Sequence, residues 1–209
     1  KNLSFICRLM NIYCQVNKIS LPIDTFRHNI LCMTKQNTPY IVKNSLFFCS
    51  EDIVWQEVPQ EASLAFLIAG CPLRCHGCHS ADSWHPQQAQ ALSADYLRQR
   101  LHIYRGLITC LLFMGGEWQP QALQELLRIA RAQGLKTCLY TGAELEDLQQ
   151  LTPPLLPYLD YVKTGPWKVD LGGLDNPCSN QRFIEVSSGK VLNHLFLARN
   201  ATTNTVSVY

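Results

Sequence analysis

The sequence predicts an α/β fold built on a layer of parallel strands, and three observations lead to this prediction. Apolar runs at 63–69, 107–114 and 136–141 end at or next to glycine, which is typical of strands buried on both faces. Each run precedes a segment in which apolar residues recur with helical spacing. Since parallel neighbours need crossover connections, this alternation favours a parallel sheet.

The first two strand–helix pairs have clear boundaries. The first run, SLAFLIA, ends at Gly70, and its helix begins after a capping Ser93 and ends before Gly106. The second run, LITCLLFM, ends at a glycine pair. The helix after it has Pro120 at its first position and ends before Gly134.

The later elements follow the same order. The third run, KTCLYT, ends before Gly142, and leucines at helical spacing predict a helix over 145–151 that is terminated by the prolines at 153–154. Short apolar segments at 161–163 and 183–186 predict further strands. The functional loops of such a sheet are expected at the carboxyl ends of its strands.

Residues 1–48 differ from the rest of the chain. They hold six of the 18 Lys and Arg residues against a single acid, Asp24, and contain no glycine and no sustained periodic pattern. We therefore expect an unassigned basic extension over 1–48, poorly ordered or not part of the native product, and a functional domain over 49–209.

Composition excludes several classes of function. The 209 residues are 47% hydrophobic, which excludes wholesale disorder. A net charge of +2 with 16% charged residues does not resemble a nucleic-acid-binding surface. No apolar run reaches the roughly 18 residues of a membrane span. Neither nucleic acid nor membrane is therefore expected as a partner.

The sharpest chemical feature is the C-x3-C-x2-C run of Cys71, Cys75 and Cys78, directly after the first strand. Thiolates select zinc, Cu(I) or iron–sulfur clusters. A structural zinc ion usually has four ligands, whereas a [4Fe–4S] cube held by three cysteines keeps one iron open. His76 or His79 could complete a zinc site, so a zinc-stabilised binding module remains an alternative.

The remaining cysteines of the domain have different surroundings. Cys110 and Cys138 lie within the apolar runs and are expected to be small core residues. Cys178 lies in a loop, and its role is left open.

These motifs resemble the radical S-adenosylmethionine superfamily. Residues from about 50 to 190 look, more narrowly, like the activating component of the anaerobic (class III) ribonucleoside-triphosphate reductase. Four elements carry the resemblance: CPLRCHGCHS with Gly77 before the third cysteine, Gly115-Gly116-Glu117, Thr141-Gly142, and the late segments YVKTGPW at 161–167 and Ser179-Asn180-Gln181-Arg182. Trp118 stands where that family commonly has proline.

The resemblance implies two cofactors. A [4Fe–4S] cluster would be bound by Cys71, Cys75 and Cys78, and S-adenosylmethionine would chelate the open iron. The cofactor contacts would come from Gly77, Cys78, His79, Gly115, Gly116, Glu117 and Thr141. One electron from the reduced cluster would cleave the sulfonium to methionine and a 5′-deoxyadenosyl radical. The chemistry belongs to the cofactors, so no side chain is assigned as acid, base or nucleophile.

The resemblance also implies partners. The radical would take hydrogen from a glycine of the large catalytic subunit of the anaerobic reductase, and a low-potential electron donor would reduce the cluster. Ser179, Asn180, Gln181 and Arg182 are expected to bind the partner's glycine-bearing loop. The expected location is cytoplasmic.

The implied fold is a partial, open (βα) barrel of the radical S-adenosylmethionine type with parallel strands. About 140 residues carry the motifs, too few for a closed barrel of ~250 residues, and the open side would admit a partner's loop. Two other enzyme functions remain alternatives: activation of a different glycyl-radical enzyme, and a small-molecule reaction like that of 7-carboxy-7-deazaguanine synthase.

Overall fold

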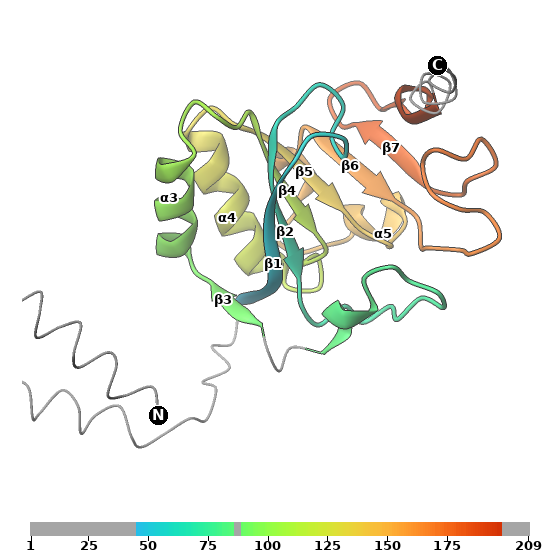
Figure 1. Ribbon diagram of the computed structural model, residues 1–209, viewed down its shortest axis with the longest axis horizontal. Helices are drawn as coiled ribbons and strands as arrows, with labels where there is room; N and C mark the ends of the chain where they lie inside the picture. The colour runs from blue at the N-terminus through green and yellow to red at the C-terminus, as the bar shows by residue number, and fades with distance from the viewer. Residues whose placement is uncertain (1–44, 86–88, 198–209) are drawn as a thin grey trace, which may run out of the picture. The chain divides into compact units, whose positions relative to one another are not determined.

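Eight strands form one open sheet in the order β3-β1-β2-β4-β5-β6-β7-β8 (Figure 1). The computed structural model describes residues 45–85 and 89–197, so most of the segment expected as an N-terminal extension lies outside the described residues. The strands are β1 (Leu46–Val54), β2 (Ser63–Ile68), β3 (Gln90–Leu92), β4 (Cys110–Met114), β5 (Lys136–Tyr140), β6 (Tyr161–Thr164), β7 (Arg182–Glu185) and β8 (Lys190–Val191).

Within residues 45–85 and 89–197, a helical segment at 194–197 follows the last strand, and three other α-helices and two 3-10 helices lie earlier in the chain. These earlier helices are α3 (Ala94–Ile103), α4 (Pro120–Ala132), α5 (Leu145–Gln149), η1 (Ala81–Trp84) and η3 (Leu156–Tyr158). Ser93 caps α3 as predicted, because its hydroxyl accepts a hydrogen bond from the Tyr96 backbone N–H at 3.1 Å. Across 45–85 and 89–197, no helix combines the length and the apolar character required to cross a bilayer.

The predicted parallel layer is confirmed at the centre of the sheet. β2, β4, β5 and β6 pair in parallel, whereas β1 and β3 on one side and β7 and β8 on the other pair antiparallel. The difference follows from the connections: α3, α4 and α5 lie between the parallel neighbours, while β1 reaches β2 through a hairpin without a helix. The fold is therefore an open α/β sheet with antiparallel edges.

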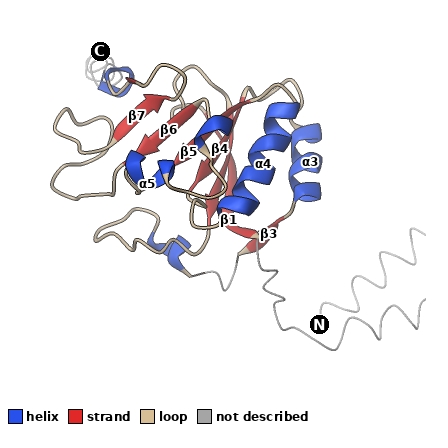
Figure 2. Cartoon of the chain, turned by 180° about the vertical axis from the view of Figure 1, so that it is seen from behind, coloured by secondary structure: helices blue, strands red, loops and turns tan. Residues whose placement is uncertain are grey.

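The two faces of the sheet are covered differently. α3, α4 and α5 lie on one face (Figure 2), where Phe66 and Phe113 stack with ring centroids 6.1 Å apart. On the opposite face, Leu112, Cys138 and Phe183 join a smaller cluster that Phe196 covers from the C-terminal segment. This second face is covered by loops and by the short helical segment at 194–197 that carries Phe196.

The largest departures from the sequence prediction are the start of β4 and the presence of β1. β4 begins at Cys110 rather than at Leu107, which is 67% exposed and whose N–H donates to the Tyr104 carbonyl in the turn after α3. β1 was not predicted, and it begins at Leu46, within the segment assigned to the extension. A register shift between Phe48 and Ser50 interrupts its period-2 alternation and hides the strand in the sequence.

Candidate iron–sulfur site

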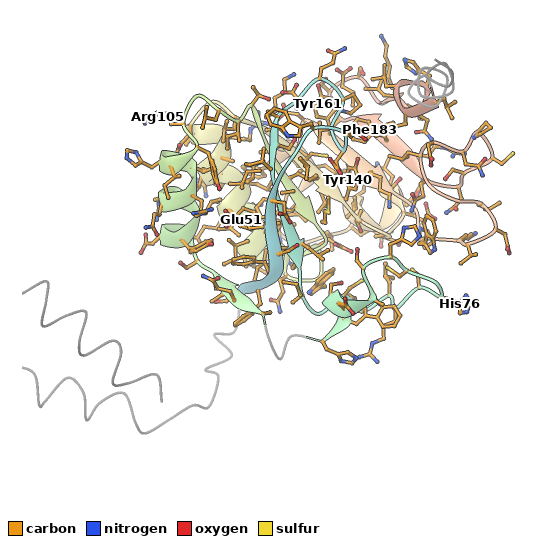
Figure 3. All side chains as sticks on the ribbon, in the orientation of Figure 1. Glu51, His76, Arg105, Tyr140, Tyr161 and Phe183 are labelled. Atoms are coloured by element: carbon orange, nitrogen blue, oxygen red, sulfur yellow. The ribbon has the colours of Figure 1, made fainter. Side chains whose placement is uncertain are left out.

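The three-cysteine loop follows β2, and a main-chain hydrogen bond joins its start to the 3-10 helix η1 after it. The Gly70 N–H donates to the Ser83 carbonyl at 2.6 Å, which holds η1 against the end of β2. Within the loop, the Cys78 N–H donates to the Cys75 carbonyl at 3.1 Å. His76 is exposed and lies at the outer tip of this loop, away from the sheet (Figure 3).

Gly77 is required by both its backbone and its surroundings. Its φ of 68° lies in the left-handed region, and a Cβ there would lie 2.5 Å from the Val169 Cγ2 atom. The glycine before the third cysteine therefore allows the loop to approach the segment after β6.

The three thiols line one cavity of about 190 Å³, here called the thiol cavity. Its opposite wall comes from the carboxyl ends of neighbouring strands, with Glu117 after β4, Thr141 after β5 and Lys163 in β6. Apolar and aromatic side chains complete it, among them Leu67, Leu73, Trp84, Met114, Trp118, Tyr140 and Trp167. The structure thus brings predicted site residues from the loop after β2 and from the ends of β4 and β5 to one cavity.

Glu117 is a buried carboxyl with one oxygen left without a hydrogen bond. It is 7% exposed, and its Oε1 accepts a hydrogen bond from Thr141 Oγ1 at 2.7 Å. Its Oε2 is buried and has no hydrogen-bond partner among the described residues. Burial raises the pKa of Glu117, while the Thr141 hydroxyl, the Glu117 backbone N–H and the Lys163 charge act to lower it. A cationic ligand group in the thiol cavity would satisfy the free oxygen.

Lys163 is partly buried and brings an ammonium group to the same cavity. Burial lowers the pKa of Lys163 to about 8, against the opposing effect of Cys75, Cys78 and Glu117. Its ammonium lies 5.8 Å from the Tyr140 ring centroid. Within the described part of the chain it makes neither a hydrogen bond nor an ion pair.

A second cavity of about 570 Å³, here called the neighbouring cavity, adjoins the thiol cavity. Both are lined by Cys78, Ser80, Tyr140, Lys163 and Trp167. Its lining is completed by Gln56 and Glu57 from the β1–β2 hairpin and by His79, Leu174, Asp175, Gln181 and Phe196. The shared residues make the two cavities one continuous site.

The seven predicted cofactor contacts separate into three groups. Cys78, Gly115, Glu117 and Thr141 line the thiol cavity, and His79 lines the neighbouring cavity, with its ring centroid 4.5 Å from that of Trp167. Gly77 and Gly116 line neither cavity. A Cβ on Gly116 would lie 3.4 Å from Leu46 Cδ1, so this glycine packs against the core on the helix-covered side.

The four residues predicted to bind a partner mostly bond within the chain. Ser179 Oγ donates to the Gly172 carbonyl at 3.2 Å, and Asn180 Nδ2 donates to the Pro166 carbonyl at 2.9 Å. Gln181 Nε2 donates to the Gly165 carbonyl at 3.3 Å, and the Arg182 guanidinium donates to the Ser179 carbonyl at 2.6 Å. Of the four, only Gln181 lines a cavity. This segment therefore shapes the loop after β6 from within.

The donor set of the thiol cavity fits an iron–sulfur cluster better than a single ion. The three cysteines are half-buried and form no disulfide, and burial raises the pKa of Cys71. Among residues 45–85 and 89–197, no three His, Cys, Asp or Glu side chains are grouped tightly enough for one metal ion. A zinc site gathers its sulfurs at about 2.3 Å from one centre, whereas a cube accepts each thiolate on a different iron.

The histidines do not complete a zinc site with these thiols. His76 lines neither cavity and His79 lines only the neighbouring one. Cys110 and Cys138 are fully buried in the core as predicted, and burial raises the pKa of Cys110 to about 12. Such thiols are poor ligands, because their thiolate forms are strongly disfavoured.

Sequence reasoning assigned no role to several residues that line the thiol cavity. Lys163 carried a signal, because a lysine within a short buried strand needs a reason to be there. Trp84 and Trp167 carried none, yet each has a buried indole N–H without a hydrogen-bond partner in the described structure. The aromatic wall of the thiol cavity is formed by the way the loops fold, which the spacing of residues in the sequence does not reveal.

Comparisons with known proteins agree with this arrangement. Part of the chain is 33% identical over 82 residues to the pyruvate formate-lyase-activating enzyme of Clostridium pasteurianum, which covers 35% of this chain and 33% of that enzyme. The chain thus matches about a third of the length of this relative. Residues 62–189, more than half of the chain, match the family described as the 4Fe-4S single cluster domain. With its three cysteines lining one cavity inside the matched region, the chain belongs to the 4Fe-4S single cluster domain family.

Proposed function

We propose that this chain is a radical S-adenosylmethionine enzyme that activates a glycyl-radical enzyme. The observation that carries the proposal is the convergence of Cys71, Cys75, Cys78 and Glu117 on one cavity at the carboxyl ends of parallel strands. Three thiols leave one iron of a cube free, and the adjacent carboxyl offers a free oxygen for the ligand's amino group. The relative's printed activity supports the same class of reaction.

The residues of the cavity have distinct tasks in this proposal. The three thiols would hold the cluster, and Glu117 Oε2, fixed by the bond between Oε1 and Thr141, would orient the amino group of S-adenosylmethionine. Gly115, with a φ of 92°, would let the main chain come close to the ligand. The aromatic and aliphatic walls exclude water, which protects a reactive radical from side reactions.

The bound cofactors would supply the one-electron cleavage of a sulfonium, which yields a radical able to take hydrogen from carbon. The neighbouring cavity supports a glycine-bearing loop of a partner protein as the hydrogen source. Its lining of polar side chains, including Gln56, Glu57, Asp175 and Gln181, offers donors and acceptors to a peptide main chain. Its continuity with the thiol cavity would bring the glycine close to the reacting centre.

We propose the large subunit of the anaerobic ribonucleoside-triphosphate reductase as the partner, on the resemblance of the segments 161–167 and 179–182. Ser179, Asn180 and Arg182 would act by holding the wall of the neighbouring cavity, and Gln181 by facing it. A low-potential carrier would supply the electron, and the clustered thiols make a cytoplasmic location our expectation.

A second partner has an observation in its favour. The relative is named for pyruvate formate-lyase, so a glycyl-radical enzyme of that type is the alternative to the reductase.

One experiment tests the class and the partner together. The chain, reconstituted anaerobically with iron and sulfide and then reduced, is incubated with S-adenosylmethionine and one of the two candidate partners. We expect 5′-deoxyadenosine in the product mixture and a glycyl-radical signal in electron paramagnetic resonance with the reductase only. A signal with pyruvate formate-lyase only would reassign the partner. Bound zinc without visible absorption would contradict the proposed class.

A further inference from the structure

Lys163 is a partly buried cation for which the described residues provide no ion-pair partner. It is the third residue of β6 and lies between Tyr140 on β5 and Phe183 on β7 in the strand register. Both of these neighbours are aromatic, and the Lys163 ammonium lies over the Tyr140 ring, 5.8 Å from its centroid. Burying a charge without a partner is costly, so such a lysine indicates an anion in its surroundings.

The anionic groups that face Lys163 identify that anion. Lys163 lines the thiol cavity together with Cys75, Cys78 and Glu117, and its electrostatic interactions are with these three groups. No carboxylate lies within ion-pair distance of its ammonium in the part of the chain that the structure describes. Cys75 and Cys78, two of the three predicted cluster ligands, are thus close enough to Lys163 to interact with it electrostatically. In a loaded site these thiols would be thiolates on iron.

We propose that Lys163 is a positioning residue that sets the reduction potential of the iron–sulfur cluster, by placing a fixed positive charge beside its Cys75 and Cys78 ligands. The redox step is simple: an external one-electron donor gives one electron to the oxidised cluster, and Lys163 keeps its proton throughout. No bond to Lys163 forms or breaks.

The sign of the effect follows from electrostatics. Reduction adds one negative charge to a site where three thiolates already outweigh the charge of the cluster core. A nearby ammonium stabilises the more negative, reduced state, and poor screening in a buried site strengthens the interaction. Lys163 should therefore raise the reduction potential and make the cluster easier to reduce. Potentials of such clusters depend on net charge and solvent exposure in this way.

The test compares four proteins reconstituted with iron and sulfide: the wild type, Lys163→Met, Lys163→Arg and Lys168→Met. Lys168 is the matched control, because it lies in the loop after β6, is exposed and lines neither cavity. Its substitution removes the same charge from a screened position. Each protein is poised at a fixed ambient potential near the wild-type midpoint, and visible absorption and electron paramagnetic resonance give the ratio of reduced to oxidised cluster.

We expect this ratio to fall roughly tenfold in Lys163→Met, to change less than about threefold in Lys163→Arg, and to stay unchanged in Lys168→Met. An unchanged ratio in Lys163→Met would overturn the proposal. If the ratio is unchanged and equilibrium dialysis also shows weaker binding of S-adenosylmethionine, Lys163 serves the ligand rather than the cluster.

Lys163→Gln covers the case in which Lys163→Met takes up no cluster. Loading of Lys163→Arg but of neither neutral variant would overturn the proposal, because the positive charge would then be required for cluster uptake rather than for the potential. If Lys163→Arg also takes up no cluster, the proposal is overturned, because the site would then require the shape of the lysine side chain rather than its charge. The inference rests on the cluster of the proposed function and not on radical transfer. A wild-type chain that binds no iron and sulfide would contradict the proposed function instead.

Discussion

The Thr141 hydroxyl donates a hydrogen bond to Glu117 Oε1 at 2.7 Å and so joins the carboxyl ends of β5 and β4 beside the thiol cavity. The same hydroxyl accepts a hydrogen bond from the Ala143 N–H at 2.9 Å, which fixes its orientation. Because Oε1 is engaged, Oε2 is the oxygen that remains free for a ligand. The pair therefore converts a buried carboxyl into a directed acceptor.

Replacing Thr141 with valine should weaken the binding of S-adenosylmethionine about tenfold. Valine keeps the volume but removes the donor, so Glu117 Oε1 loses its partner and the carboxyl loses its orientation. A hydrogen bond to a charged group contributes roughly 1.5–3 kcal/mol. Equilibrium dialysis on the cluster-loaded, oxidised protein measures the affinity, and Thr152→Val, at an exposed position before Pro153, is the control. Equal affinities in all three proteins would show that the bond does not orient the carboxyl.

Replacing Glu117 with glutamine should stabilise the cluster-free chain at neutral and higher pH. Burial raises the pKa of this carboxyl, so the folded chain holds the proton more tightly than the unfolded chain. The free energy of unfolding therefore falls as pH rises from the ordinary carboxyl pKa through the raised one. Glutamine does not titrate, so this decrease in the free energy of unfolding is absent from the variant.

The measurement is a comparison of Tm values at pH 4 and pH 8. We expect Glu117→Gln to melt higher than the wild type at pH 8, by about 2–4 °C for each 1 kcal/mol of relief, and to lose this advantage at pH 4. Glu125→Gln, at an exposed position on α4, should show no such pattern. The same Glu117 variant should bind S-adenosylmethionine more weakly, which is the trade-off expected of a functional carboxyl.

Replacing any of Cys71, Cys75 or Cys78 with alanine should abolish the visible absorption of the cluster and the cleavage of S-adenosylmethionine. A cube with three protein ligands has none to spare. Iron and sulfide content after reconstitution measures the loss. Cys110→Ala and Cys178→Ala are matched controls, one fully buried in the core and one exposed, and neither lines the thiol cavity. A folded Cys110→Ala protein without a cluster would mean that the ligands are misassigned.

The central strands could be predicted from the sequence because they are short apolar runs that end at glycine. β2 and β5 begin at the predicted residues and end within one residue of the predicted boundaries. β1 could not be predicted, because a bulge shifts its register and charged residues follow on the same strand. β3 and β8 are too short for a periodic signal, with three and two residues.

In the candidate site, too, features carried by adjacent residues could be predicted, whereas contacts between distant residues could not. The spacing of Cys71, Cys75 and Cys78 and the glycine pair before Glu117 are local signals, and the structure brings these four predicted site residues to one cavity. The roles of residues 179–182 were harder to predict, because the sequence of a polar loop is the same whether its hydrogen-bond donors face solvent or bond within the chain. Here the partners of Asn180 and Gln181 are carbonyls of residues 165 and 166, which only the tertiary structure brings near.

A chain that begins at Cys49 should be much less stable than one that begins at Ser45. The shorter chain lacks Leu46 and Phe48, which are 1% and 5% exposed, and loses every register pair between β1 and β3. Removing a large core side chain costs roughly 2–5 kcal/mol. Soluble yield and thermal melting measure the difference. Equal Tm values would place the start of the domain after β1's first three residues.

Replacing Asn180 with alanine should lower glycyl-radical yield while leaving the uncoupled cleavage of S-adenosylmethionine largely intact. Asn180 Nδ2 holds the Pro166 carbonyl at 2.9 Å, and Pro166 precedes Trp167, which lines both cavities. Loss of this bond loosens the wall that a partner's loop would meet, whereas the thiols, Glu117 and Thr141 lie on other loops and keep their contacts.

The two activities are read separately, as 5′-deoxyadenosine formed without a partner and as the glycyl-radical signal formed with the reductase. Asn176→Ala serves as the control, since its carbonyl oxygen Oδ1 accepts from the Cys178 N–H at 2.9 Å in the same connection but its side chain lines neither cavity. If both activities fell together in Asn180→Ala with loss of S-adenosylmethionine binding, the segment would serve the cofactor. If the radical yield were unchanged, the bond to Pro166 would have no bearing on the partner, and the neighbouring cavity would have to bind the loop through its other walls.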